Sequence, residues 1–246
     1  MTSNQLVRWI LKPAVFVTAL VPFVWLVWAV AMALSGTDVA PLRLVSALFG
    51  YAANLGADPL KEITDETGIW TLRFLCITLV ITPLRRLTGW NAAVRFRRML
   101  GLFAFFYGTL HLLVFVVFDR LAGMGFPSPL ALQTLRDLAS SIGSEVLKRP
   151  YITVGFTSWV CMLALAATST GGMVRRLGGK RWRALHRLIY VAAIAGVLHY
   201  WWLVKADIRQ PAAYAVVVGI LLLIRLVWAV RSRMTAPLRA APVTRS

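Results

Sequence analysis

Three histidines are the residues of this chain best suited to chemistry, because the sequence has no others and each lies in or beside a long apolar segment. His111 lies within YGTLHLLVF, His199 within VAAIAGVLHYWWLV, and His186 just before the second of these segments. Imidazole serves either as a proton carrier or as a metal ligand. An ionisable group buried in an apolar segment is costly and is usually functional, although a single histidine can also be a hydrogen-bonded core residue.

Two of these histidines are expected at nearly the same height. The segment of His111 begins near Met99 and that of His199 near Leu185, so the two rings lie about 18 Å and about 21 Å along their helices. Two imidazoles that face each other in a helix bundle are the axial ligand set of a heme iron. We therefore expect His111 and His199 to hold one heme, and the alternative is two unrelated core histidines.

Glycines accompany both histidines at the same spacing. Gly108 and Gly196 each precede a histidine by three residues, so each histidine has a patch without a side chain on its own helical face. A flat macrocycle can approach the backbone at such a patch, whereas the alternative use of these glycines is helix packing. The spans predicted below contain no carboxylate, which argues against a zinc or copper site and against an ion-coupled transporter.

A second pair of basic residues lies at the other end of the same two segments. Arg97 precedes His111 by 14 residues, almost four full turns, and therefore shares its helical face. His186 precedes His199 by 13 residues and needs a bend or an irregular first turn to do the same. We expect Arg97 and His186 to bind a heme propionate, a quinone headgroup or a flavin phosphate, and the alternative for His186 is contact with lipid headgroups.

The elements that position these residues are transmembrane helices. The chain of 246 residues is 59% hydrophobic, with a mean hydropathy of +0.72, and crossing a bilayer takes roughly 20 helical residues. The sequence therefore predicts an all-α membrane protein, a bundle of six transmembrane helices that forms one domain over residues 1–246, with a disordered basic tail at 232–246. The expected spans are Pro13 to Leu34, Ile69 to Leu84, Met99 to Phe118, Tyr151 to Thr168, Leu185 to Val204 and Pro211 to Val230.

The charges predict the orientation. Arginine and lysine fill the second and fourth loops and the C-terminal tail, and all nine carboxylates lie in the first, third and fifth loops. The positive-inside rule then places both termini in the cytoplasm. The net charge of +18 is explained by this topology and by anionic lipid rather than by nucleic acid. We expect the first span to stay as an uncleaved anchor and the segment 39–57 to be an interfacial or loop helix.

The chain resembles the ferric reductase-like transmembrane family, in particular its heme-binding subunits that serve methionine sulfoxide reduction. The similarity rests on LGADPLKEITDETG, RRMLGLFAFFYGTLHLLVF, KRPYITVGFTSWVCMLALAATST and LGGKRWRALHRLIYVAAIAGVLHYWWLVK. Insertions near 36–51 and 119–144 depart from the family pattern. In the wider family two helices carry two histidines each and hold two hemes. Here Arg97 replaces one inner histidine, so we expect one b-type heme, with a second as the alternative.

The resemblance implies a non-catalytic electron-transfer subunit in the bacterial inner membrane. Its expected partner is a periplasmic, molybdenum-containing methionine sulfoxide reductase that repairs oxidised proteins, and its expected donor is the quinone pool or a cytoplasmic flavin reductase, with FMN also associated with the family. Two other functions stay open: a structural or assembly protein without redox activity, and a stand-alone ferric reductase-type cytochrome b. The last normally needs a fused flavin domain, for which the residues after the sixth span do not suffice.

Overall fold

The computed structural model describes residues 3–35, 55, 58–121, 124 and 132–235, and in this part of the chain all regular elements are helices. The elements are α1 (Ser3–Leu6), η1 (Val7–Leu11), α2 (Lys12–Ser35), α4 (Pro59–Thr88), η2 (Asn91–Ala93), α5 (Val94–Val114), η3 (Phe115–Leu121), α6 (Leu132–Lys148), α7 (Pro150–Ala167), α8 (Gly171–Leu185), α9 (Leu188–Leu203) and α10 (Arg209–Thr235).

The six predicted spans are confirmed as six apolar helices. Five helical stretches in the described residues are long and apolar enough to cross a membrane, and α9 is a shorter apolar helix. Large apolar side chains on the outside of these helices remain exposed, as expected of a surface that contacts lipid. The chain is therefore a multi-pass membrane protein. The five longer stretches are Val7–Met32, Pro59–Thr88, Asn91–Phe118, Pro150–Ala167 and Arg209–Ser232.

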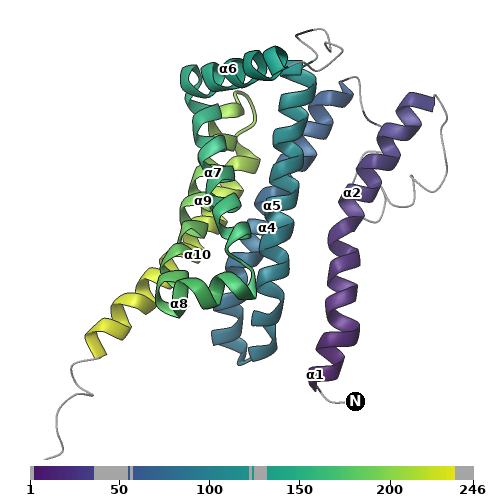
Figure 1. Cartoon of the computed structure of the whole chain (residues 1–246). Helices are drawn as coiled ribbons and strands as arrows, with labels where there is room; N and C mark the ends of the chain where they lie inside the picture. Colours follow the sequence, from purple (N-terminus) through teal and green to yellow (C-terminus); the bar gives the residue numbers. More distant parts are fainter. Residues whose placement is uncertain (1–2, 36–54, 56–57, 122–123, 125–131, 236–246) are drawn as a thin grey trace, which may run out of the picture.

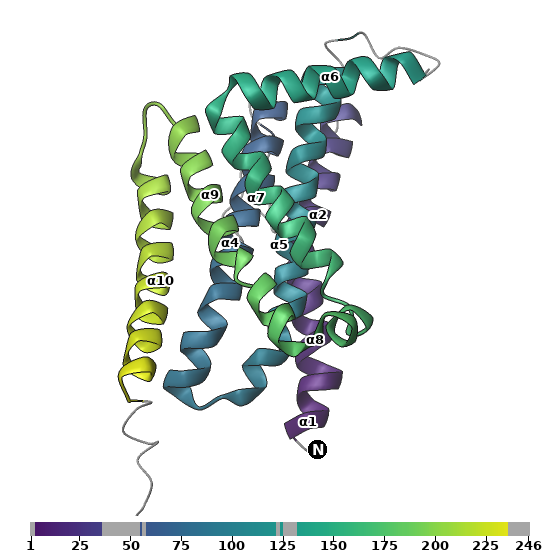
Figure 2. The ribbon, with the colours of Figure 1, turned by 60° about the vertical axis from the view of Figure 1, so that its left-hand side comes forward.

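Two short helices define the two ends of the bundle. The spanning helices run roughly alongside one another, α6 lies across one end and α8 lies near the other (Figures 1 and 2). We call these the α6 end and the α8 end. The first described residues and the end of α10 both lie toward the α8 end (Figure 2).

The second span is longer than the apolar run predicts. Asp58 caps α4 by accepting a hydrogen bond from the Lys61 N–H at 3.0 Å, and Pro59 occupies its first turn. Both features favour helix initiation at this point, well before the apolar run begins. The prediction that no carboxylate lies within a spanning helix is therefore wrong. The first turns of α4 contain Glu62, Asp65 and Glu66.

Several predicted segment boundaries differ from the helix boundaries in the structure. The predicted insertion at 119–144 contains most of α6, and α10 continues to Thr235, beyond the predicted start of the tail at 232. The fifth span begins at Leu188 because residues 186 and 187 form a turn after α8. Residues 36–54, which include most of the predicted interfacial helix, lie outside the described residues.

A tyrosine joins α2 to the rest of the bundle beside a proline. Pro22 has no N–H and interrupts the hydrogen-bond ladder of α2. The buried Tyr107 hydroxyl of α5 donates to the Ala19 carbonyl at 2.8 Å and accepts from the Phe23 N–H at 3.1 Å. One side chain thereby satisfies two backbone groups of the turn that contains Pro22, which a lipid environment requires.

Replacement of Tyr107 by phenylalanine should destabilise the protein by about 1 to 2 kcal/mol, because two buried backbone groups lose their partner. Thermal unfolding in detergent, followed by circular dichroism, measures the loss. Tyr214→Phe is the matched control, since its hydroxyl has no hydrogen bond among the described residues. Equal stability of the two variants would contradict this role of Tyr107.

A second proline is compensated by an arginine that the sequence analysis overlooked. Pro83 lies inside α4 and leaves the Leu79 carbonyl, four residues earlier, without its helical donor. Arg225 of α10 donates to this carbonyl and also to the Leu221 carbonyl, the latter at 2.8 Å. The charged side chain in the apolar sequence LLLIRLVW thus attaches α10 to α4.

Candidate functional site

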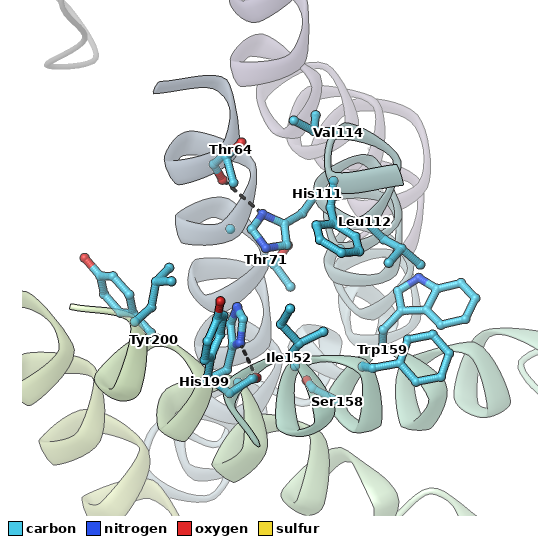
Figure 3. Close-up of a pocket in the computed structure, with 18 of the residues that line it drawn as sticks. Thr64, Thr71, His111, Leu112, Val114, Ile152, Ser158, Trp159, His199 and Tyr200 are labelled. Atoms are coloured by element: carbon cyan, nitrogen blue, oxygen red, sulfur yellow. Dashed lines mark hydrogen bonds between the residues drawn. The ribbon is translucent and has the colours of Figure 1, made fainter. Parts of the chain in front are cut away.

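His111 of α5 and His199 of α9 meet inside the bundle. Their ring centroids are 6.0 Å apart and the ring planes are almost perpendicular, at 82° (Figure 3). The fold thus brings together the two histidines that the sequence analysis placed at one height. Two metal–nitrogen bonds of about 2 Å each, plus half a ring on either side, give a centroid separation of about 6 Å across one metal ion.

Backbone carbonyls orient both rings. His111 Nδ1 donates to the Thr64 carbonyl at 3.0 Å and lies 3.4 Å from the Thr67 hydroxyl. His199 Nδ1 donates to the Tyr151 carbonyl at 2.7 Å. A proton on each Nδ1 leaves the lone pair on each Nε2, the arrangement found when a histidine ligates a metal.

Each of these carbonyls lies one helical turn before a glycine. Thr64 precedes Gly68 in α4, and Tyr151 precedes Gly155 in α7. A helical side chain points back over the preceding turn, so a glycine leaves that turn's carbonyl accessible to the imidazole. Both histidines are therefore held in the same way, by a backbone carbonyl of a neighbouring helix: His111 by α4 and His199 by α7.

The two glycines are in direct contact with the rings. A Cβ at Gly155 would lie 2.7 Å from His199 Nδ1, and a Cβ at Gly68 would lie 3.2 Å from His111 Cε1. Single-sequence analysis missed both residues, because the contacts cross between helices and neither glycine has a fixed spacing from a histidine. Gly68 lies nine residues after the first residue of α4 and Gly155 five residues after that of α7, so no common position within a helix marks them either.

The rings line a cavity of about 400 Å³ between α4, α5, α7 and α9 (Figure 3). Ligand pockets commonly have volumes of about 300–1,000 Å³. Gly108 and Gly196, predicted to allow a macrocycle to approach, both line it. Their missing Cβ positions face Met162 Cε, at 2.8 Å, and Leu72 Cδ2, at 3.0 Å, so both glycines also permit close helix packing.

The donor set fits a heme. Two imidazoles with free Nε2 atoms border an apolar cavity, and their separation suits one iron between them. Within the described ranges no three residues among His, Cys, Asp and Glu cluster to hold a metal ion. A zinc-type site, which uses three or four protein ligands, is therefore not supported by the described residues.

Arg97, near the start of α5, and His186, just after α8, both lie toward the α8 end. His186 follows the last residue of α8, its ring stacks on Trp182 at 3.8 Å between centroids, and its Nδ1 donates to the Trp182 carbonyl at 3.1 Å. Burial lowers the pKa of His186, and the nearby positive charge of Arg97 lowers it further. The structure has an irregular turn at residues 186–187, between α8 and α9. That His186 shares a face with His199 stays a prediction.

Comparisons with known proteins agree with this arrangement. The family model described as the ferric reductase like transmembrane component matches residues 67–197, a region that contains His111 and ends just before His199. Three similar proteins are each named protein-methionine-sulfoxide reductase heme-binding subunit MsrQ. The relative from Herminiimonas arsenicoxydans is 51% identical over 76% of this chain and 80% of its own length. Those from Ralstonia nicotianae and Xanthomonas euvesicatoria are 47% and 46% identical, over 87% and 83% of this chain and 84% and 88% of their own lengths.

Proposed function

Because the chain belongs to the ferric reductase-like transmembrane family, and within it to the MsrQ family, we propose that it carries electrons across a membrane to a methionine sulfoxide reductase. The relatives are named heme-binding subunits of a protein-methionine-sulfoxide reductase, and these names are the basis for proposing both the heme and the catalytic partner. The observation that carries the proposal for this chain is the pair of facing imidazoles, His111 and His199, in an apolar cavity.

His111 and His199 would hold the heme iron in this proposal. When bound, a heme iron with two imidazole ligands accepts and donates one electron at a time and has no open coordination position for oxygen. The carbonyls of Thr64 and Tyr151 keep the Nδ1 protons in place, so each Nε2 stays unprotonated and directed at the metal. Apolar side chains from α4, α5, α6, α7 and α9 limit the access of water to the ligands.

We assign one b-type heme to the described site. Arg97 stands where a second histidine would be needed near the α8 end, and a guanidinium offers no lone pair to iron. Together with His186 it would form a site suited to a quinone headgroup or the phosphate of FMN. A propionate of the His111–His199 heme is not the expected ligand here, because neither side chain lines that cavity. Electrons from the quinone pool or a cytoplasmic flavin reductase would enter here.

The orientation follows from the loop charges. The α4–α5 connection, α8 and the C-terminal end of α10 lie toward the α8 end and are rich in arginine. By the positive-inside rule this end, with both termini, faces the cytoplasm of a bacterial inner membrane. The α6 end then faces the periplasm, where a molybdenum-containing reductase would receive the electrons.

Replacement of Arg97 or His186 by leucine should slow reduction of the protein by its donor about tenfold, because hydrogen bonds to a charged ligand contribute about 1.5 to 3 kcal/mol. Most of the heme should remain bound, since neither side chain lines the His111–His199 cavity. Stopped-flow absorbance with a reduced quinol or reduced flavin as the donor measures the rate. Complete loss of heme in either variant would refute this assignment.

The proposed function is tested by electron delivery. Purified protein, reduced with dithionite and freed of excess reductant, should be reoxidised by the purified catalytic subunit only when methionine sulfoxide is present. A colourless protein after heme-replete expression would instead support a structural or assembly role. Reoxidation by ferric citrate, with none by the catalytic subunit, would support a stand-alone ferric reductase.

A further inference from the structure

The cavity that contains the two histidines has an uneven distribution of charge. Of the described residues that line it, Arg149 is the only lysine or arginine and Asp65 the only carboxylate. Both lie near the start of a helix, Asp65 in α4 and Arg149 just before α7, and therefore toward the α6 end. Leu72 and Met162 line the same cavity deeper along these two helices. The charged lining residues thus lie at the α6 end of the cavity, which we call its mouth and which Ile142 and Val146 of α6 also line, whereas the deeper lining, called the floor, has no lysine, arginine or carboxylate.

The two charged residues at the mouth, Asp65 and Arg149, have different ion-pair partners. Asp65 is paired with Lys61 at 2.6 Å. Glu145 of α6 is shared by two arginines, since Arg149 Nε lies 2.7 Å and Arg120 Nη1 lies 3.4 Å from its carboxylate oxygens. The carboxylate of Glu145 thus contacts both guanidiniums and offsets part of the positive charge on the Arg149 side of the mouth.

Arg149 is also linked to the ligand His199. Its Nη1 donates to the Tyr151 hydroxyl at 3.2 Å, while the carbonyl of the same tyrosine holds His199. The side chain of Arg149 is half exposed, whereas that of Glu145 is only 16% exposed. Arg149 already lines the cavity, so its guanidinium can meet an anion there while its Nε stays paired with Glu145.

We propose that Arg149 is a positioning residue that pairs with a propionate of the heme at the mouth of the cavity, and that Glu145 limits how much of its positive charge the iron experiences. A heme is apolar except along the edge that carries its carboxylates, so that edge faces the charged mouth and the remainder faces the apolar floor. A guanidinium is the side chain best shaped to bind a carboxylate. This inference rests on the proposed function.

The proposal predicts that substitutions of Arg149 and of Glu145 shift the midpoint potential of the heme in opposite directions. Arg149→Leu removes a positive charge near the iron and so favours the oxidised state. We expect about a tenfold higher oxidised-to-reduced ratio at a fixed potential, which is a fall of about 59 mV in midpoint potential for a one-electron couple. Glu145→Gln removes a negative charge and should raise the potential, and Arg149→Lys should lie between Arg149→Leu and the unsubstituted protein.

Spectroelectrochemical titration of the heme-loaded protein in lipid nanodiscs measures these shifts, and dialysis against apomyoglobin measures heme retention. Arg120→Leu is the matched control, because Arg120 contacts the same glutamate but does not line the cavity. Its shift should be much smaller than that of Arg149→Leu. Faster heme loss in Arg149→Leu than in Arg120→Leu further supports the propionate contact.

The competing explanation is that Arg149 only anchors α6. Arg149→Leu and Glu145→Gln would then break the same ion pair and shift the potential in the same direction, and that result overturns the proposal. An unshifted potential in Arg149→Leu also overturns it. If the variants still show a low-spin spectrum, either of these two results refutes only the role of Arg149 and not the assignment of His111 and His199 as ligands. Absence of heme from the unsubstituted protein would refute the proposed function itself.

Discussion

Replacement of His199 or His111 by alanine should abolish the low-spin spectrum of a bis-imidazole heme and lower the heme bound per chain by more than about tenfold. The loss of hydrogen-bonding partners behind a metal ligand already costs about 10- to 100-fold in affinity, so the loss of a ligand should cost at least as much. The rings of these histidines face each other across 6.0 Å. Visible absorption spectra and a pyridine hemochrome assay of the purified variants measure both effects.

Added imidazole provides the control for misfolding. Alanine leaves a space of the size of the missing ring, and free imidazole can enter it and restore the second nitrogen ligand. Recovery of the low-spin spectrum in His199→Ala with imidazole shows that the bundle is intact. A low-spin spectrum that persists in both alanine variants without imidazole contradicts the ligand assignment.

Gly155→Ala should displace His199 and reduce heme binding nearly as strongly as removal of the ligand. The new Cβ would lie 2.7 Å from Nδ1, 2.9 Å from Cε1 and 3.0 Å from Cγ of the ring. The ring cannot retreat without losing its 2.7 Å hydrogen bond to the Tyr151 carbonyl. We therefore expect a predominantly high-spin spectrum and a heme content several-fold lower, measured by absorption and by electron paramagnetic resonance.

Other glycines of the bundle supply a graded series of controls. A Cβ at Gly68 would lie 3.2 Å from His111, one at Gly101 would lie 3.9 Å from Thr78, and one at Gly143 would meet nothing within 4 Å. Gly68→Ala should weaken heme binding less than Gly155→Ala. Gly101→Ala and Gly143→Ala should leave the spectrum unchanged, since alanine favours a helix by about 1 kcal/mol. A Gly155→Ala protein with a normal heme content would contradict the packing described for His199.

The sequence predicted the parts of this molecule that depend on local pattern. Apolar runs located all six helices, since a bilayer requires about 20 apolar residues per crossing. The heights of His111 and His199 followed from the constant rise of a helix.

Most of the features that the sequence did not reveal involve contacts between helices. The hydroxyl of Tyr107 compensates for Pro22, and the guanidinium of Arg225 compensates for Pro83, but neither pair is close in sequence. The glycines that contact the histidines lie on other helices for the same reason. The carboxylates of α4 were misplaced because the apolar run begins later than the helix, which starts at its Asp58 cap.

The proposed site is tested most directly by the heme content and spin state of the unsubstituted protein, purified from heme-replete cells. Quantitative hemochrome analysis with electron paramagnetic resonance of the oxidised protein should give one b-type heme per chain, wholly low-spin, as two imidazole ligands require. A protein without heme, or with a high-spin heme that binds cyanide or carbon monoxide readily, would contradict a single iron held between His111 and His199.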